Sequence, residues 1–169
     1  MRPPTPLGGD VSPGIIEVVD VDDERDLILI CYVSAAATKL EKPDIVALLA
    51  SARTRNAALG ISGMLLYVEP TFFQILEGEA AAVRGLYATI AGDTRHTAIL
   101  KLIEEPIERR SFADWTMGYA DVSRSELATI PGLNDFFLGA SSLFELEPGR
   151  AQMLLAAFRE GRWRRRLSG

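Results

Sequence analysis

The sequence predicts an α+β fold, in which one β-sheet carries two helices on one face and further helices follow toward the C-terminus. Three observations support this class. Short apolar runs rich in β-branched and aromatic residues recur through the first two thirds of the chain, and two segments between them repeat apolar residues at helical spacing. From Leu127 onward the pattern is entirely helical. With 169 residues, 48% of them hydrophobic, the chain is long enough to form one globular domain around a sizeable core.

The first strand and the first helix are predicted from residues 27–59. Leu27–Val33 is a continuous apolar run, which is typical of a central strand buried on both faces. Pro43 suits the first turn of the helix that follows, and Leu59-Gly60 is expected to end it. The apolar face of this helix recurs at helical spacing through Ile45, Leu48, Leu49 and Ala52.

A hairpin and a second helix–strand pair are predicted next. The apolar runs 64–68 and 72–76 flank a turn at Glu69-Pro70-Thr71, and Gly78 is expected to stop the second strand. A helix over 81–90, a strand over 98–103 and a short aromatic strand over 115–119 complete the order βαββαββ. This order is that of a ferredoxin-like sheet with an extra strand, and right-handed crossovers place both helices on the same face.

The chain divides into three predicted parts. Residues 1–25 are rich in proline, glycine and acidic residues and are expected to be a flexible leader, and 26–121 form the sheet domain. Residues 122–169 form a C-terminal helical segment that serves in transmission or dimerisation. The apolar side of its last helix needs a surface, either the free face of the sheet or a second subunit.

Composition excludes several functions. The net charge of -5 argues against a nucleic-acid binder. The single cysteine, the lack of a signal peptide and the lack of a long apolar stretch predict a cytoplasmic protein that does not enter the membrane. His96 is the only histidine and has no neighbouring cluster of ligands, so we expect no metal site. Five arginines fall in the last eleven residues, either as a solvated helix end or as a contact for an acidic partner: Arg159, Arg162, Arg164, Arg165 and Arg166.

Three polar residues stand in or next to apolar segments. Tyr32 lies in the first strand, Gln74 lies in the middle of the most apolar strand, and Asn56 follows Arg55 near the end of the first helix. Each unmade hydrogen bond of a buried glutamine costs roughly 1–3 kcal/mol, so Gln74 implies a polar group nearby. That group is either a ligand or the phenol of Tyr32 itself.

The motifs around these residues resemble those of BLUF domains, which are flavin-binding sensors of blue light. The resemblance runs from about Leu27 to Tyr119 and rests on five segments in order. They are Ile30–Ser34, Arg55-Asn56 with Gly60-Ile61-Ser62-Gly63, Phe72–Gly78, Asp93–His96 and Arg109–Met117.

The resemblance implies a non-covalently bound flavin, with FAD expected and FMN or riboflavin as alternatives. The ring would lie between the two helices, flanked by Leu48 and Ile90. Asn56 would bind its N3/O4 edge, Arg55 would lie near O2, and Gln74 would bridge Tyr32 and the N5/O4 edge. The ribityl or phosphate end would be held by Arg95 and His96.

The resemblance also implies how the sensor works. Light would drive transfer of an electron and a proton away from Tyr32, and after recombination Gln74 would be left rotated or tautomerised, with absorption shifted to the red. The side chains implied in relaying this change are Ser34, Trp115 and Met117, the last two on the fifth strand.

No catalytic module fits in the remaining residues, so we expect no enzyme activity. The output is expected to pass to a separate effector protein or to a change in a homo-oligomer. Two rival functions remain. One is a ferredoxin-like regulatory module that binds a small molecule without photochemistry. The other is an acyl-phosphate hydrolase using Arg55 and Asn56, although an arginine-bearing phosphate loop is missing after the first strand.

Overall fold

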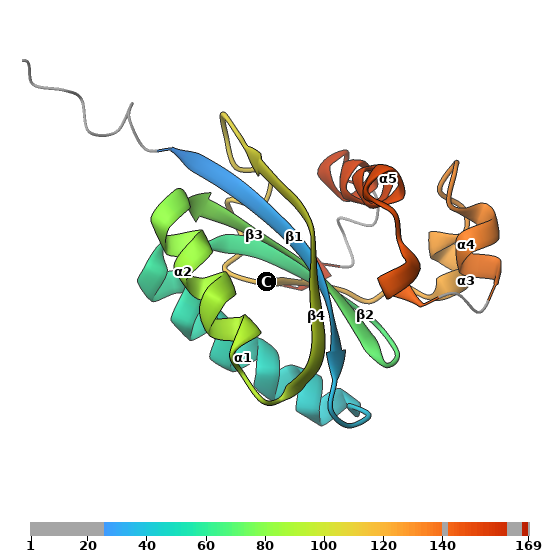
Figure 1. Ribbon diagram of the computed structural model, residues 1–169, viewed down its shortest axis with the longest axis horizontal. Coiled ribbons are helices and arrows are strands. Elements are labelled where there is room, and N and C mark those ends of the chain that lie inside the picture. The colour runs from blue at the N-terminus through green and yellow to red at the C-terminus, as the bar shows by residue number, and fades with distance from the viewer. Residues whose placement is uncertain (1–25, 140–141, 162–166, 169) are drawn as a thin grey trace, which may run out of the picture.

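The computed structural model describes residues 26–139, 142–161 and 167–168. The predicted leader, 1–25, and four of the five C-terminal arginines lie outside the described residues. One sheet forms the middle layer, with two helices, α1 (Lys42–Leu59) and α2 (Ala80–Ala91), on one face and the C-terminal helices on the other (Figure 1).

The sheet has six strands in the spatial order β4-β1-β3-β2-β5-β6. β1 pairs antiparallel with both β3 and β4, while β2 pairs antiparallel with β3 and parallel with β5. The predicted βαββαββ order is confirmed, and a two-residue strand, β6, adds to the edge next to β5. The bounds are β1 Leu27–Ala36, β2 Ser62–Val68, β3 Thr71–Glu79, β4 His96–Pro106, β5 Gly118–Ala120 and β6 Leu167–Ser168.

The two long helices, α1 (Lys42–Leu59) and α2 (Ala80–Ala91), cover the same face of the sheet, as right-handed crossovers require (Figure 1). α1 begins with a reciprocal capping box between Glu41 and Asp44 and has Pro43 in its first turn. It ends at Gly60, whose φ of 67° lies in the left-handed region. The proline and the glycine therefore have the roles that the sequence predicts.

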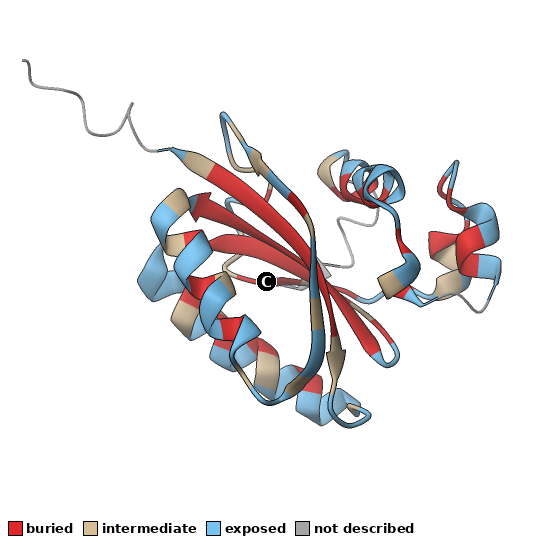
Figure 2. Ribbon diagram, viewed as in Figure 1, coloured by how far each residue is buried: buried red, intermediate tan, exposed pale blue. Residues whose placement is uncertain are grey.

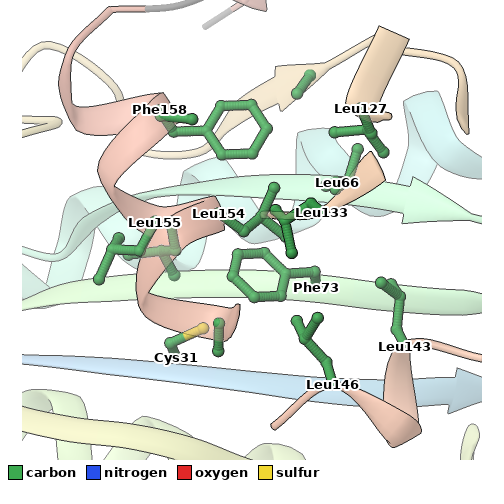
Figure 3. Close-up of a cluster of buried hydrophobic side chains, with 14 of the residues drawn as sticks. Cys31, Leu66, Phe73, Leu127, Leu133, Leu143, Leu146, Leu154, Leu155 and Phe158 are labelled. Atoms are coloured by element: carbon green, nitrogen blue, oxygen red, sulfur yellow. The ribbon is translucent and has the colours of Figure 1, made fainter. Parts of the chain in front are cut away.

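The opposite face of the sheet is covered by the C-terminal helices. These are α3 (Arg124–Leu127), α4 (Asn134–Leu138), the 3-10 turn η1 (Leu143–Glu145) and α5 (Pro148–Arg159). Leu154, Leu155 and Phe158 of α5 belong to one buried cluster with Phe73 and Cys31 of the sheet (Figure 3). The sequence left open whether the last helix packs on the free face of the sheet or on a second subunit. In the structure it packs on the free face of its own sheet.

The central strands β1, β2 and β3 are buried on both faces, whereas the edge strand β4 is largely exposed and each long helix is buried along one side only (Figure 2). In β1, Ile30 and Tyr32 belong to the core under α1 and α2, while Cys31 and Val33 belong to the core under the C-terminal helices. Because side chains alternate along a strand, this double burial accounts for the unbroken apolar run in the sequence.

Three sequence predictions of strand ends were wrong. Thr71 already pairs with Val68, so the hairpin turn has two residues rather than three. Gly78 does not stop β3, because it continues the ladder opposite Ile28 and the strand runs on to Glu79. The fifth strand covers only Gly118–Ala120 because a turn precedes it, and its Trp115 N–H donates to the Phe112 carbonyl at 3.0 Å. Trp115 and Met117 therefore precede β5.

Within the described ranges, no helix combines the length and the apolar character needed to cross a membrane.

Candidate functional site

A cavity of about 260 Å³ lies between α1 and α2 and the sheet, and is called the helix-side cavity below. Its volume is near the lower end of small-molecule pockets, which start at about 300 Å³. All of the predicted cofactor-binding residues except Asn56 line it. The lining includes Tyr32, Leu48, Arg55, Gln74, Ile90, Arg95 and His96.

The walls of the cavity come from five elements. α1 contributes Leu48 and Arg55, and α2 contributes Ile90. β1, β3 and β4 contribute Tyr32, Gln74 and His96, respectively. Its apolar walls and few directed polar groups suit a flat aromatic molecule.

Tyr32 and Gln74 lie directly opposite each other in the β1–β3 ladder. The Tyr32 hydroxyl donates to the Gln74 Oε1, and the Gln74 Nε2 donates to the sulfur of Met117 at 3.6 Å. A thioether is a weak acceptor, and the amide nitrogen carries two hydrogens. Gln74 therefore keeps one amide hydrogen and one oxygen lone pair for a molecule in the cavity.

The phenol of Tyr32 stays protonated. Complete burial raises its pKa well above the usual value, and the nearby Arg55 guanidinium opposes this shift only in part. Tyr32 is therefore a neutral hydrogen-bond donor near neutral pH.

Lys101 pairs with this tyrosine because of an irregularity in β4. Between Cys31 and Tyr32 the β1–β4 register shifts, so that Lys101 rather than Leu102 pairs with Tyr32. The Lys101 ammonium lies 4.9 Å from the ring centroid of Tyr87, whose ring meets the Tyr32 ring edge-on at 5.4 Å. Sequence patterns do not reveal such a bulge.

Asn56 is completely buried beside the cavity, and its amide is already engaged. Its Nδ2 donates to the Thr116 carbonyl at 2.6 Å, and its Oδ1 accepts from the Arg55 Nε at 3.4 Å. The structure thus directs the amide of Asn56 toward the residues before β5, whereas the sequence prediction directs it toward the ring edge of a flavin.

Arg95 and His96 lie at the mouth of the cavity, Arg95 in the connection from α2 to β4 and His96 as the first residue of β4. Asp93 accepts two hydrogen bonds from Arg95 Nε, at 3.0 and 2.9 Å, which hold the pKa of Asp93 well below its usual range. Burial lowers the pKa of His96, so its imidazole is neutral near pH 7. Its buried Nδ1 has no partner among the described residues. An unpaired buried nitrogen beside a cavity fits the binding of a polar molecule there.

The three predicted relay residues do not all lie on the same side of the sheet. Met117 is completely buried on the side of α1 and contacts Gln74. Trp115 is half-buried against the core under the C-terminal helices, with its ring 6.1 Å from that of Phe112. Ser34 is buried near the end of β1. Of the two residues before β5, Met117 is thus the one that faces the cavity side.

Two residues that the sequence analysis did not select contact the segment before β5. Arg53 of α1 donates from Nε to the Met117 carbonyl at 2.9 Å. Glu77 is completely buried near the end of β3. Glu77 shows the signal that singled out Gln74, which is a polar residue in an apolar strand. The interaction of Arg53 with a carbonyl 64 positions away leaves no trace in the sequence.

Comparison with known proteins agrees with the fold. The family model described as "Sensors of blue-light using FAD", the BLUF family, matches residues 27–118. A photoactivated adenylate cyclase subunit beta of Euglena longa is 36% identical over 118 residues, which are 69% of this chain and only 14% of that protein.

Two solved structures are also similar. The dark-state structure of BlrB, a BLUF protein, gives a TM-score of 0.62 at 34% identity, covering 81% of this chain and 98% of that one. The photo-activated state of BlsA gives a TM-score of 0.67 at 29% identity, covering 79% of this chain and 94% of that one.

An α+β domain with a cavity for a flat aromatic molecule, bordered by a tyrosine–glutamine pair, is the architecture of a light-sensing flavoprotein. The chain belongs to the BLUF family of blue-light photoreceptors, which bind flavin.

Proposed function

We propose that this BLUF protein binds FAD in the helix-side cavity and signals to a separate protein through its C-terminal helices, without catalysis of its own. The observation that supports it is the hydrogen bond from Tyr32 to Gln74 at the cavity wall. A bound flavin would supply the absorption of blue light and a polar edge for Gln74 to bind.

Gln74 has two hydrogen-bonding arrangements within the same space. Its oxygen now accepts from Tyr32 and its nitrogen donates to Met117. Rotation of the amide would exchange these atoms, so that the nitrogen faces the Tyr32 oxygen and the carbonyl faces the cavity and Met117. The two arrangements offer opposite partners to a molecule in the cavity, which is what a switch requires.

The groups at the cavity mouth favour a flavin that carries phosphate, FAD or FMN, over riboflavin, and FAD is the flavin in the description of the matching family. Arg95 is largely exposed and forms its ion pair with Asp93, at 2.5 Å, beside the unpaired nitrogen of His96. A guanidinium and an imidazole at the edge of a pocket suit a phosphate-bearing tail. Chromatography of the flavin released by denaturation tests this, and recovery of FMN or riboflavin from protein offered all three would refute it.

The C-terminal helices are the proposed output. α5 is joined to β4 through Glu105, which accepts from Gln152 at 3.1 Å and from Arg159 at 3.2 Å. A change in the sheet would reach a partner protein, or a second copy of the chain, through this layer. Limited proteolysis and the oligomeric state, each compared in darkness and in blue light, test the proposal, and identical results in both would count against it.

The decisive experiment is the visible absorption spectrum of the FAD-loaded protein before and after blue light. We expect a flavin band that shifts slightly to the red and recovers in darkness. Tyr32→Phe should retain the flavin and lose the shift. Tyr87→Phe is the matched control, because it keeps the edge-on ring and removes a hydroxyl that does not bind Gln74. A protein that stays colourless after incubation with excess FAD would favour a metabolite-binding module instead.

A further inference from the structure

Glu77 is a completely buried carboxylate on the face of the sheet opposite the cavity. It accepts hydrogen bonds from the Ser62 hydroxyl at 3.1 Å and from the backbone N–H groups of Ser111 and Phe112, at 3.0 and 2.6 Å. A buried charge is tolerated only when such bonds replace water. Arg110 adds a cation nearby, since its NH1 donates to the Ser62 hydroxyl at 3.1 Å.

The backbone that Glu77 holds leads directly to Met117. Residues 111–117, called the bridge segment below, are also held through three consecutive carbonyl groups. The Trp115 carbonyl accepts from the Gly63 N–H at 3.1 Å, the Thr116 carbonyl from Asn56 at 2.6 Å, and the Met117 carbonyl from Arg53 at 2.9 Å. The bridge segment therefore begins on the face of Glu77 and ends on the face of Gln74.

A carboxylate is the group that this position requires. Two successive backbone N–H groups, one directed at each oxygen of the Glu77 carboxylate, form a small anion-binding site. A glutamine would fit the same volume, but its NH2 group would face one of these N–H donors and leave it unpaired. Glu77→Gln should therefore loosen the start of the bridge segment with little change in packing.

We propose that Glu77 is a positioning residue of the photosensor: by fixing the start of the bridge segment it holds Met117 against Gln74, and so stabilises the arrangement in which the Gln74 oxygen accepts from Tyr32. The inference rests on the proposed switching of Gln74. Loss of the anchor weakens this arrangement and lowers the driving force for returning to it in darkness.

The first test needs no flavin. The chain has two tryptophans, and in a Trp163→Phe background Trp115 of the bridge segment is the only one. In flavin-free protein, Glu77→Gln should shift Trp115 emission to longer wavelength and increase its quenching by acrylamide. Glu69→Gln is the control, because Glu69 is an exposed carboxylate paired with Lys39 at 3.4 Å. Unchanged Trp115 emission in Glu77→Gln would overturn the anchoring role.

The second test uses FAD-loaded protein and measures dark recovery after blue light. Glu77→Gln should slow recovery by roughly threefold or more, and this effect should vanish in a Met117→Leu background because the two residues act in series. Recovery at the wild-type rate or faster, or an equal slowing with Leu at position 117, would overturn the proposal. If the wild-type protein itself shows no red shift, the proposed function fails, and the emission test decides separately whether Glu77 anchors the segment.

Discussion

The amide nitrogen of Asn56 lies 2.6 Å from the carbonyl oxygen of Thr116, so that the buried end of α1 is joined to the residues before β5. We expect Asn56→Ala to lower the free energy of unfolding by about 1–3 kcal/mol, because the substitution leaves this carbonyl unsatisfied. Urea denaturation of flavin-free protein measures the change and separates it from any contribution of flavin binding.

Thr54→Ala is the control on the same helix. Thr54 is exposed, and its hydroxyl donates only to the Ala50 carbonyl within α1, at 3.1 Å. Its loss should change stability by no more than about 0.5 kcal/mol. Equal effects of the two substitutions would mean that the Asn56–Thr116 bond contributes nothing to stability.

Two glycines should respond in opposite directions to the same substitution. Gly60 has a φ of 67° and open space around it, so Gly60→Ala adds only backbone strain and should cost about 1–2 kcal/mol. Gly85 lies within α2, also in open space, and Gly85→Ala should stabilise the protein by about 0.5–1 kcal/mol. Thermal unfolding of both variants tests this, and destabilisation by Gly85→Ala would show that α2 needs flexibility there.

Stability should depend on pH through His96. Burial lowers the pKa of His96 in the folded protein below its ordinary value of 6.5, so the unfolded chain takes up the proton first as pH falls. The stabilising contribution is therefore complete above about pH 6.5 and is lost as pH falls from there toward the folded pKa.

Urea denaturation of wild type and His96→Gln at pH 7.5 and pH 5.5 isolates this contribution, because His96 is the only histidine. The loss of stability between the two pH values should be smaller in the variant. A loss of the same size in both proteins would place the pH dependence elsewhere.

The C-terminal layer should be part of the folded core of a single chain. Leu154 is completely buried against the sheet, so Leu154→Ala should cost about 2–5 kcal/mol (Figure 3). Met153→Ala is the neighbouring control, since Met153 is 45% exposed and should cost far less. Urea denaturation at two protein concentrations completes the test. A concentration-dependent midpoint in the wild-type protein would show that a second copy contributes to this core.

Local patterns predict much of this fold. The double-sided burial of β1 appears as an apolar run, and Pro43 and Gly60 mark the first turn and the end of α1. The need to satisfy a buried amide allows Gln74 two partners, a ligand or Tyr32, and the structure pairs Gln74 with Tyr32. These features depend on neighbours in sequence or on one strand pairing.

Hydrogen bonds between side chains and backbone groups far away in the sequence could not be predicted. The residues before β5 bend because Glu77 and α1 bind their N–H and carbonyl groups, so an aromatic run with strand propensity does not become a strand. The pairing of Lys101 with Tyr32 likewise depends on one extra residue in β4. Tertiary contacts decide the local structure at these positions, and the spacing of apolar residues in the sequence does not reveal such contacts.

One apolar layer lies on each face of the sheet. The layer under α1 and α2 contains the helix-side cavity. The layer under α5 is the larger of the two and contains none of the predicted flavin-binding residues. We therefore expect the chain to fold before it acquires a flavin, with flavin loading as a late step of maturation. Cellular flavin supply would then set how much of this protein is light-sensitive without changing how much of it is folded.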